Sequence, residues 1–313
     1  MRILFAGTPE IAVPSLEKAA AEFEVCGVLT NPDKVQGRGK KILPPPVKVK
    51  AMELGIPVFQ FSKLRSDSRK VITALGPDIL AVFAYGRIFG PKFLSLFKYG
   101  GINVHPSLLP KYRGSSPLLS AILNGDKESG ITVQQIALEM DSGDILTQMR
   151  FPLTGKETTL SLSKYAAVKG ADLLVEVLHR IDEGTADAVP QNDAEASYCG
   201  KVEKSDGMID WGEAVEIIER KIRAFNPWPV CYTFLDGRRL NIFEAEIAEG
   251  GKSGTDLPGK ILGVDKNHGI LVQTVNGILA VQKLQLQSKK AMDWKTFING
   301  MPKIIGLVLG GSQ

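Results

Sequence analysis

RILFAGTPEIAVPSLEKAAAEFEVCGVLT, residues 2–30, decides the fold class of this chain. An apolar run at 2–6 ends at Gly7-Thr8-Pro9. Apolar residues at helical spacing then cover 11–23, and a β-branched, apolar run covers 25–30. A strand, a helix and a second strand in succession are typical of a parallel sheet with helices packed on its faces.

The same alternation continues to about residue 140. Helical patterns are predicted at 47–54, 65–75 and 117–124, and extended patterns at 58–61, 79–85, 102–104 and 131–137. A long helix is predicted at 160–183. The sequence therefore predicts an α/β, Rossmann-like domain over residues 1–184, with a mainly parallel sheet and helices on both of its faces.

A different pattern follows the long helix. Residues 185–204 are polar and poor in large apolar side chains, so we expect a linker there. One helix is predicted at 213–225, followed by five short strands at 231–235, 239–246, 259–264, 269–274 and 277–287. Turn signals such as Asp236-Gly237 separate these strands. Residues 205–313 are thus expected to form a small β-barrel, for which the OB-fold is one candidate.

The overall composition agrees with two globular domains. The chain has 313 residues, of which 44% are hydrophobic and 23% are charged, and this excludes a disordered chain, a collagen-like repeat and a coiled-coil rod. Its three cysteines, Cys26, Cys199 and Cys231, form no CxxC pair. We therefore expect a reduced, cytoplasmic protein without a disulfide framework or a cysteine metal site.

The net charge does not by itself indicate a nucleic-acid partner, and the hydropathy does not indicate a membrane-spanning segment. The net charge of +4 is too small to predict nucleic-acid binding by itself. The strand predicted from residue 2 leaves no room for a signal peptide. Apolar runs such as 79–85 are far shorter than the roughly 20 residues that cross a bilayer.

The densest group of chemically capable residues lies at 101–110, GINVHPSLLP. Asn103 and His105 are two apart on a predicted strand, so their side chains leave the same face. An amide and an imidazole directed at one point can bind and polarise a carbonyl oxygen. The alternative is a histidine that only satisfies a buried carbonyl, and the spacing alone does not choose between the two.

A second group, Met140-Asp141-Ser142-Gly143-Asp144, follows a predicted strand. Ordinary turn chemistry explains it equally well, because Asp, Ser and Gly are common turn residues. In the functional interpretation an aspartate orients and charges the histidine. Periodicity does not show that the two groups meet in space.

A third group, at 31–46, is basic and rich in glycine and proline. Arg38, Lys40 and Lys41 lie within eight positions that contain four basic residues in all. Such a run attracts phosphate, although a solvated loop is the commoner outcome. Its glycines do not match a P-loop, and Gly7-Thr8-Pro9 lacks the GxGxxG dinucleotide fingerprint.

Taken together, these segments resemble the methionyl-tRNA formyltransferase family. The Asn103–Pro110 run, with Asp141 placed 36 residues after His105, is shared by folate-dependent formyltransferases in general. The segment 31–48, the corner at 223–229 and the C-terminal β-domain are more specific to the tRNA enzymes. The likeness covers essentially the whole chain and departs slightly from the usual Gly-Ala-Ala-Pro at residues 114–117.

The resemblance implies formyl transfer from 10-formyltetrahydrofolate to the α-amino group of methionyl initiator tRNA, by a monomer that needs no metal. It implies catalytic roles for Asn103, His105 and Asp141, and tRNA contacts for Arg38, Lys40 and Lys41. Folate is expected along two short segments: Ser107, Leu108, Leu109 and Pro110, and Gly86, Arg87 and Ile88. In the C-terminal domain the candidates for an RNA patch are Lys283, Lys289, Lys290 and Lys303.

Other functions remain open from the residues alone. A formyltransferase for a small amine, or a hydrolase with water as acceptor, would share Asn103, His105 and Asp141 without needing the basic loop. A non-catalytic RNA-binding protein would not need all three polar residues. The missing glycine fingerprint weighs against a nicotinamide dehydrogenase.

Overall fold

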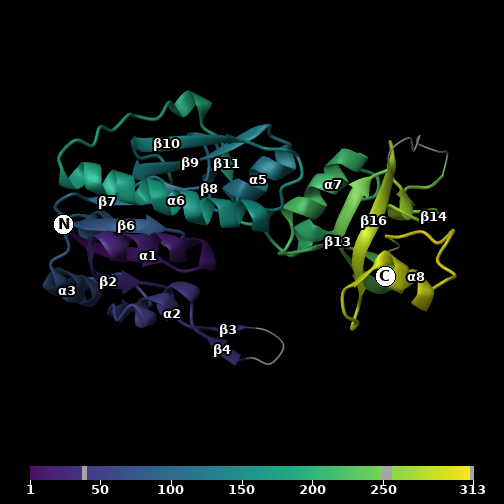
Figure 1. Ribbon diagram of the computed structural model, residues 1–313, viewed down its shortest axis with the longest axis horizontal. Coiled ribbons are helices and arrows are strands. Elements are labelled where there is room, and N and C mark those ends of the chain that lie inside the picture. Colours follow the sequence, from purple (N-terminus) through teal and green to yellow (C-terminus); the bar gives the residue numbers. More distant parts are fainter. Residues whose placement is uncertain (37–40, 249–255, 311–313) are drawn as a thin grey trace. The chain divides into compact units, whose positions relative to one another are not determined.

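The computed structural model describes residues 1–36, 41–248 and 256–310 (Figure 1). The chain folds into two compact units, between which it crosses several times. The N-terminal unit comprises Met1–Leu118, Glu128–Pro152 and Leu162–Gly200. The C-terminal unit comprises Leu119–Lys127, Leu153–Ser161 and Lys201–Gln313. No helix in the described ranges is long and apolar enough to cross a membrane.

The N-terminal unit is built on a seven-stranded sheet in the order β10-β9-β7-β6-β1-β2-β5. The strands are β1 (Arg2–Gly7), β2 (Glu24–Leu29), β5 (Val58–Phe59), β6 (Ile79–Phe83), β7 (Gly101–His105), β9 (Glu128–Gln135) and β10 (Ile145–Pro152). The five strands from β7 to β5 pair in parallel, which confirms the predicted Rossmann-like fold. β9 and β10 extend the sheet in antiparallel fashion, and β10 was not predicted.

Helices cover both faces of the parallel strands, as the sequence predicts. α1 (Val13–Glu22) and α6 (Thr159–Asp182) run across the sheet (Figure 1) and are joined by an ion pair between Lys18 and Asp172. A side chain at Gly170 would lie 3.0 Å from Val104, so glycine lets α6 approach β7 closely. On the opposite face, α3 (Ser66–Leu75) and α4 (Pro91–Leu94) contribute to an apolar cluster that also contains Leu4, Leu80 and Val82.

Shorter elements complete this unit. β3 (Lys34–Gln36) pairs with β4 (Lys41–Leu43) in antiparallel fashion, and β8 (Arg113–Gly114) pairs with β11 (Tyr198–Cys199) in parallel. α2 (Pro46–Glu53) packs against α1. α5 (Pro117–Asn124) begins in this unit and continues into the C-terminal unit from Leu119. The 3-10 helices are η1 (Glu10–Ala12), η2 (Asp193–Glu195) and, in the C-terminal unit, η3 (Ser205–Gly207).

The structure differs from the linker that we predict at 185–204. Residues 185–200 belong to the N-terminal unit, because β11 pairs with β8 and Val189 exchanges backbone hydrogen bonds with Ile145. The segment is polar, as composition indicates, but hydrogen bonds hold it in place. The boundary between the units therefore lies near Gly200 instead of residue 184.

The C-terminal unit contains an antiparallel sheet in the order β12-β13-β16-β15-β14, with β17 paired to β16. The strands are β12 (Cys231–Leu235), β13 (Arg238–Ile247), β14 (Ile261–Asp265), β15 (Gly269–Gln273), β16 (Ile278–Leu286) and β17 (Met292–Asp293). The predicted helix is α7 (Val215–Ala224), and a further helix, α8 (Trp294–Gly300), was not predicted.

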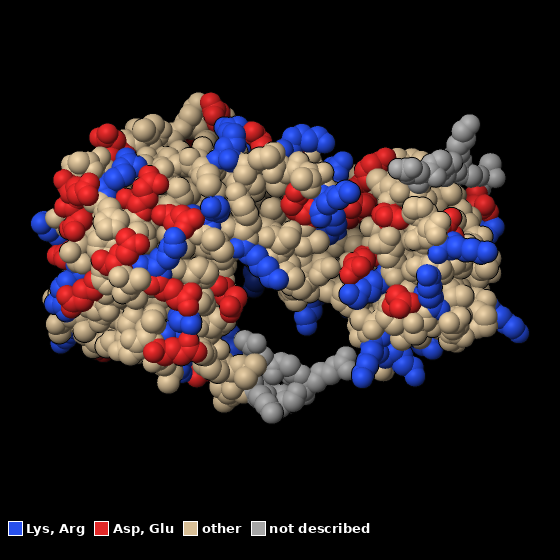
Figure 2. All heavy atoms as spheres, in the orientation of Figure 1, with Lys and Arg blue, Asp and Glu red and all other residues tan. Residues whose placement is uncertain are grey.

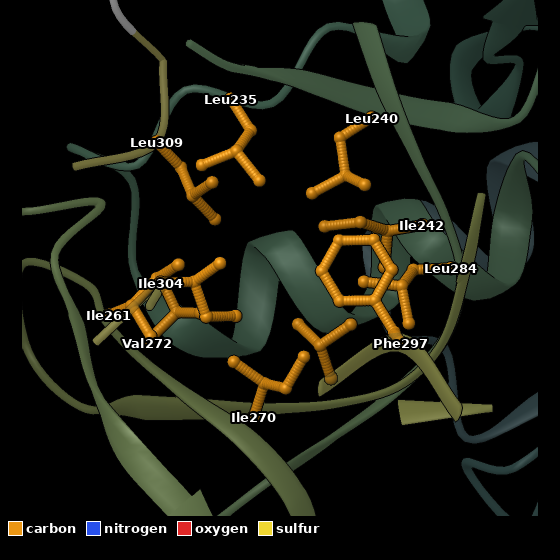
Figure 3. A pocket seen from close by; sticks show the side chains of 11 residues that line it. Leu235, Leu240, Ile242, Ile261, Ile270, Val272, Leu284, Phe297, Ile304 and Leu309 are labelled. Carbon is orange, nitrogen blue, oxygen red and sulfur yellow. The ribbon is translucent and has the colours of Figure 1, made fainter. Parts of the chain in front are cut away.

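Residues 306–310 close this sheet into a barrel. Ile261 exchanges backbone hydrogen bonds with Gly306 and Leu307, and Gly310 donates to Phe234 on β12, the strand at the other end of the sheet. Leu235, Ile242, Val272, Leu284, Phe297 and Leu309 are among the apolar side chains that point into the interior (Figure 3). The predicted small β-barrel is confirmed.

The packing of this interior predicts how a substitution there changes the free energy of unfolding. Leu235 is fully buried in the barrel, so Leu235→Ala should lower the free energy of unfolding by about 2–5 kcal/mol. All three tryptophans (Trp211, Trp228 and Trp294) lie in the C-terminal unit, so tryptophan fluorescence during urea denaturation reports on it. Leu257→Ala is the control, because Leu257 is 67% exposed; equal losses in both variants would contradict the prediction.

Candidate active site

The site is built on a polar part of the sheet face. Asn103 and His105 project from the same face of β7, as their spacing predicts. Their register partners on β9 are Gln134 and Thr132, both buried. A buried polar face must be hydrogen-bonded, and two loops fold back over these strands to supply partners.

His105 is 4% exposed and lies between two oxygen acceptors. Its Nε2 atom is 2.8 Å from the carbonyl oxygen of Tyr112, and its Nδ1 atom is 3.6 Å from Oδ2 of Asp141. A carbonyl can only accept, so Nε2 carries a hydrogen. Both nitrogens can donate at the same time only when the ring is an imidazolium.

Asp141 lies at the centre of the site, and its side chain is 14% exposed. Its Oδ1 atom accepts hydrogen bonds from Gln134 Nε2 (3.1 Å) and Asn103 Nδ2 (3.4 Å), while Oδ2 accepts from the backbone N–H of Gly114 (2.8 Å). The structure thus brings Asn103, His105 and Asp141 together, which the spacing alone left open.

The turn that carries Asp141 is tight. Asp141 has a φ of +53°, and a side chain at Gly143 would come within 1.8 Å of the carbonyl oxygen of Gln135. A glycine is therefore required at 143, and Asp141 itself adopts a left-handed conformation that L-residues disfavour. Such a backbone persists only where its surroundings fix it.

The segment Ser107–Pro110 folds back over β9 and β10. Ser107 Oγ donates to the Lys111 carbonyl (2.6 Å), Thr132 Oγ1 donates to the Ser107 carbonyl (2.7 Å), and Gln148 Nε2 donates to the Leu109 carbonyl (3.0 Å). These three bonds fix the loop. Its apolar members divide between two environments. Leu109 is buried, whereas Leu108 and Pro110 are half-buried.

The predicted segment Gly86–Arg87–Ile88 follows β6, the neighbour of β7 in the sheet. Arg87 Nε donates to Asn31 Oδ1 (2.7 Å), and its Nη1 atom donates to the Phe61 carbonyl (2.6 Å). The guanidinium therefore anchors this turn to the segments that follow β2 and β5. Gly86 has a φ of +75°, and Ile88 is 75% exposed.

Asn31 begins a further hydrogen-bonded network. Its carbonyl accepts from Gln60 Nε2 (2.8 Å), and the same amide donates to Asp33 Oδ1 (2.7 Å). Lys48 Nζ lies 2.7 Å from Asp33 Oδ2, and hydrogen bonds from Lys48 and Gln60 hold the pKa of Asp33 below its ordinary value. Asp33 and Lys48 thereby join the two ends of the predicted basic loop.

The basic residues of that loop are only partly described. Arg38 and Lys40 lie outside the described residues, and Lys41 begins β4. In the C-terminal unit, Lys283 Nζ lies 3.1 Å from Glu244 Oε1, so its charge is paired. Lys289, Lys290 and Lys303 are exposed.

Sequence reasoning missed Gln134 and Gln191, which contact Asp141, and Arg113, which donates to Gln191 Oε1. Gln191 Nε2 lies 2.9 Å from the Asp141 carbonyl oxygen and 2.7 Å from that of Gly143. Gln191 falls in the predicted linker, where composition carried no signal of a site. Among the described residues no group of three or more His, Cys, Asp or Glu could hold a metal ion.

Comparison with known proteins identifies the family. Residues 1–178 match the family profile described as "Formyl transferase", and residues 201–302 match "Formyl transferase, C-terminal domain". The chain belongs to the formyl transferase family. Residues 179–200, which include Gln191, lie between the two matched ranges of this formyl transferase.

Curated relatives of this formyl transferase are similar along their whole length. The protein named methionyl-tRNA formyltransferase of Treponema denticola is 48% identical and covers 97% of this chain and 98% of its own. The proteins of the same name from Treponema pallidum (43%; 99% of each chain) and Synechococcus (38%; 98% of each chain) are also similar.

Solved structures show the same fold at lower identity. WlaRD, a sugar 3N-formyl transferase, has a TM-score of 0.66 at 20% identity, over 93% of this chain and 99% of its own. Methionyl-tRNA formyltransferase from Clostridium thermocellum has a TM-score of 0.56 at 17% identity, over 80% of this chain and 95% of its own.

The hydrogen-bonded network at the base of the loop predicts how the pKa of Asp33 responds to a substitution of Lys48. Lys48→Met removes the ammonium group, so the pKa of Asp33 should rise toward its ordinary value. A carboxyl whose pKa is lowered in the folded state adds to the free energy of unfolding, and this contribution is lost as pH falls through that pKa. The free energy of unfolding of the variant should therefore depend less on pH in the acid range. Carboxyl NMR titration measures the shift. Lys50→Met is the control, because Lys50 contacts Glu17 and Glu53; the same Asp33 pKa in Lys48→Met as in the wild type would contradict the prediction.

Proposed function

We propose that this chain transfers the formyl group of 10-formyltetrahydrofolate to the α-amino group of methionyl initiator tRNA, in the cytoplasm and as a monomer. The observation that supports the proposal is that the side chains of Asn103, His105 and Asp141 lie next to one another over one polar face of the sheet. They lie in a chain that matches proteins named methionyl-tRNA formyltransferase along nearly its full length. Formylated methionyl-tRNA serves translation initiation.

The reaction needs stabilisation of an oxyanion. A neutral amine attacks the formyl carbonyl carbon, and the carbonyl oxygen becomes negatively charged in the tetrahedral intermediate. The bond to the folate nitrogen then breaks, so the amine nitrogen loses a proton and the folate nitrogen gains one. Preorganised hydrogen-bond donors aimed at the oxyanion lower this barrier.

Asn103 and His105 supply those donors. The amide of Asn103 has two N–H groups; one is directed at Asp141, and the other donates to the oxyanion. The Tyr112 carbonyl holds His105 Nε2, while the 3.6 Å between Nδ1 and Asp141 is longer than a hydrogen bond. When the ring is protonated, Nδ1–H is the donor that turns toward the substrate. The proton that the attacking amine loses passes to His105, Asp141 or a bound water.

Folate binds along Ser107–Pro110 and against Gly86–Ile88. The two segments follow neighbouring parallel strands, and ligands of open α/β sheets bind beyond the carboxyl ends of such strands. The hydrogen bonds of Arg87 hold its turn, and the exposed side chain of Ile88 offers an apolar surface to the flat pterin ring.

The tRNA contacts Arg38, Lys40 and Lys41 with its acceptor end. In the C-terminal barrel, exposed cations are provided by Lys289, Lys290 and Lys303. Lys283 contributes when its ion pair with Glu244 opens. Figure 2 shows the Lys and Arg side chains on one face of the molecule. Phosphate contacts of this kind position the nucleic acid, whereas base contacts specify it.

The acceptor is tested by single-turnover formylation with 10-formyltetrahydrofolate, comparing methionyl initiator tRNA with methionyl elongator tRNA. We expect a strong preference for the initiator. Arg38→Ala should weaken use of the initiator tRNA while folate binding stays unchanged, because the loop meets only the tRNA. Turnover with neither tRNA, but with folate bound, would instead assign a small amine or water as the acceptor.

The two donors are tested by Asn103→Ala and His105→Ala, and the carboxylate that orients them is tested by Asp141→Ala. Loss of one oxyanion donor costs about 3–4 kcal/mol, so kcat should fall roughly 100- to 1,000-fold. The Kd for tRNA should change little, since the site contacts only the reacting end. Asp187→Ala, a substitution outside the site, is the control. A His105→Ala enzyme with near-normal kcat would exclude this mechanism.

A further inference from the structure

The segment 189–199, here called the strap, runs beside both loops of the site. At one end Val189 exchanges two backbone hydrogen bonds with Ile145, of 2.8 and 2.9 Å. At the other end the Ser197 N–H donates to the Pro110 carbonyl (3.2 Å), and the Arg113 N–H donates to the Ser197 carbonyl (2.8 Å). The strap is thus paired with the chain that follows Asp141 and with the chain that follows the folate loop.

Gln191 is the strap residue that holds the Asp141 turn. Its Nε2 atom lies within hydrogen-bond distance of three oxygens: the carbonyls of Asp141 (2.9 Å) and Gly143 (2.7 Å), and Gln134 Oε1 (3.2 Å). The turn includes a residue at φ +53° and returns over the sheet face. A single amide therefore restrains the backbone on both sides of the turn that aims the Asp141 carboxylate.

The other end of the same amide holds the second partner of His105. Gln191 Oε1 accepts from Arg113 Nη2 (2.9 Å) and Nε (3.1 Å). The Arg113 side chain is 2% exposed, and Nη2 also lies 2.7 Å from Asp193 of the strap. Tyr112, whose carbonyl accepts from His105 Nε2, precedes Arg113, and its N–H donates to Ser197 Oγ (2.9 Å).

We propose that Gln191 is a positioning residue for formyl transfer. It fixes the Asp141 turn directly and the Tyr112 carbonyl through Arg113, and these are the two oxygen partners of the His105 ring. The inference rests on the proposed function of this site, since it assigns Gln191 a role in the same reaction. Gln191 acts through other residues and is not itself a catalytic residue.

The first test is Gln191→Met, which keeps the length of the side chain and removes its polar atoms. In single-turnover formylation the rate constant should fall about tenfold, while the KM values for methionyl-tRNA and 10-formyltetrahydrofolate stay within twofold. Glu195→Ala is the matched control on the strap, because the Glu195 carboxylate accepts from Asn192; it should leave the rate unchanged.

A double-mutant cycle separates positioning from general stability. With Asp141→Asn in place, the part of the Gln191 effect that acts through the carboxylate is lost, so Gln191→Met should lower the rate constant by clearly less than tenfold. The same tenfold loss in both backgrounds would overturn the proposal. Should Gln191→Met fail to fold, Ser197→Ala removes only the hydroxyl that holds Tyr112 and should lower the rate constant with unchanged KM.

The outcomes distinguish this inference from the proposed function. An active wild type together with Gln191→Met and Ser197→Ala variants within twofold of its rate overturns the positioning role alone. A wild-type protein that does not formylate methionyl-tRNA overturns the proposed function, and the positioning role falls with it.

Discussion

The structure of the site depends on one constraint, which is that a buried imidazole needs polar surroundings for both of its ring nitrogens. His105 is almost fully buried: its Nε2 atom is hydrogen-bonded to the Tyr112 carbonyl, and its Nδ1 atom faces the Asp141 carboxylate at 3.6 Å. These two groups come from loops more than twenty residues apart in sequence. An unsatisfied polar group of this kind costs about 1–3 kcal/mol. The loops that carry these partners must therefore fold back over the β7–β9 face, and the same folding creates the site.

The antiparallel strands β9 and β10 make this return possible. A purely parallel sheet would end at β7, with Asn103 and His105 on an edge strand. Because β9 pairs with β7 in the opposite direction, Thr132 and Gln134 extend the polar face. The connection between β9 and β10 then returns Asp141 to Asn103, where Gln134 Nε2 also contacts its carboxylate. One pair of antiparallel strands thus converts a strand edge into an enclosed polar surface.

Periodicity predicted the parallel strands, the main helices, the barrel and the shared face of Asn103 and His105, because each depends on apolar burial or on the two-residue repeat of a strand. It did not place Asp141, since the path of a turn at φ +53° leaves no periodic signal. β10 was missed because Thr147, Gln148 and Arg150 interrupt its apolar residues. Composition predicts a linker at the strap because the segment has few large apolar residues. Hydrogen bonds from side chains such as Gln191 and Ser197 hold it in place instead, and these leave no signal in the composition.

The use of hydrogen bonds in place of apolar packing follows from what the site must do. Apolar contacts are non-directional, and cores accept changes of side chain when volume is kept. They set the distance between layers but do not fix the direction of a carboxylate. Hydrogen bonds are directional, so an amide such as Gln191, bonded to carbonyls on both sides of the Asp141 turn, restrains orientation as well as position. Each partner removed also leaves a buried polar group unsatisfied. A polar segment that composition assigns to a linker is thereby suited to holding a reactive imidazole.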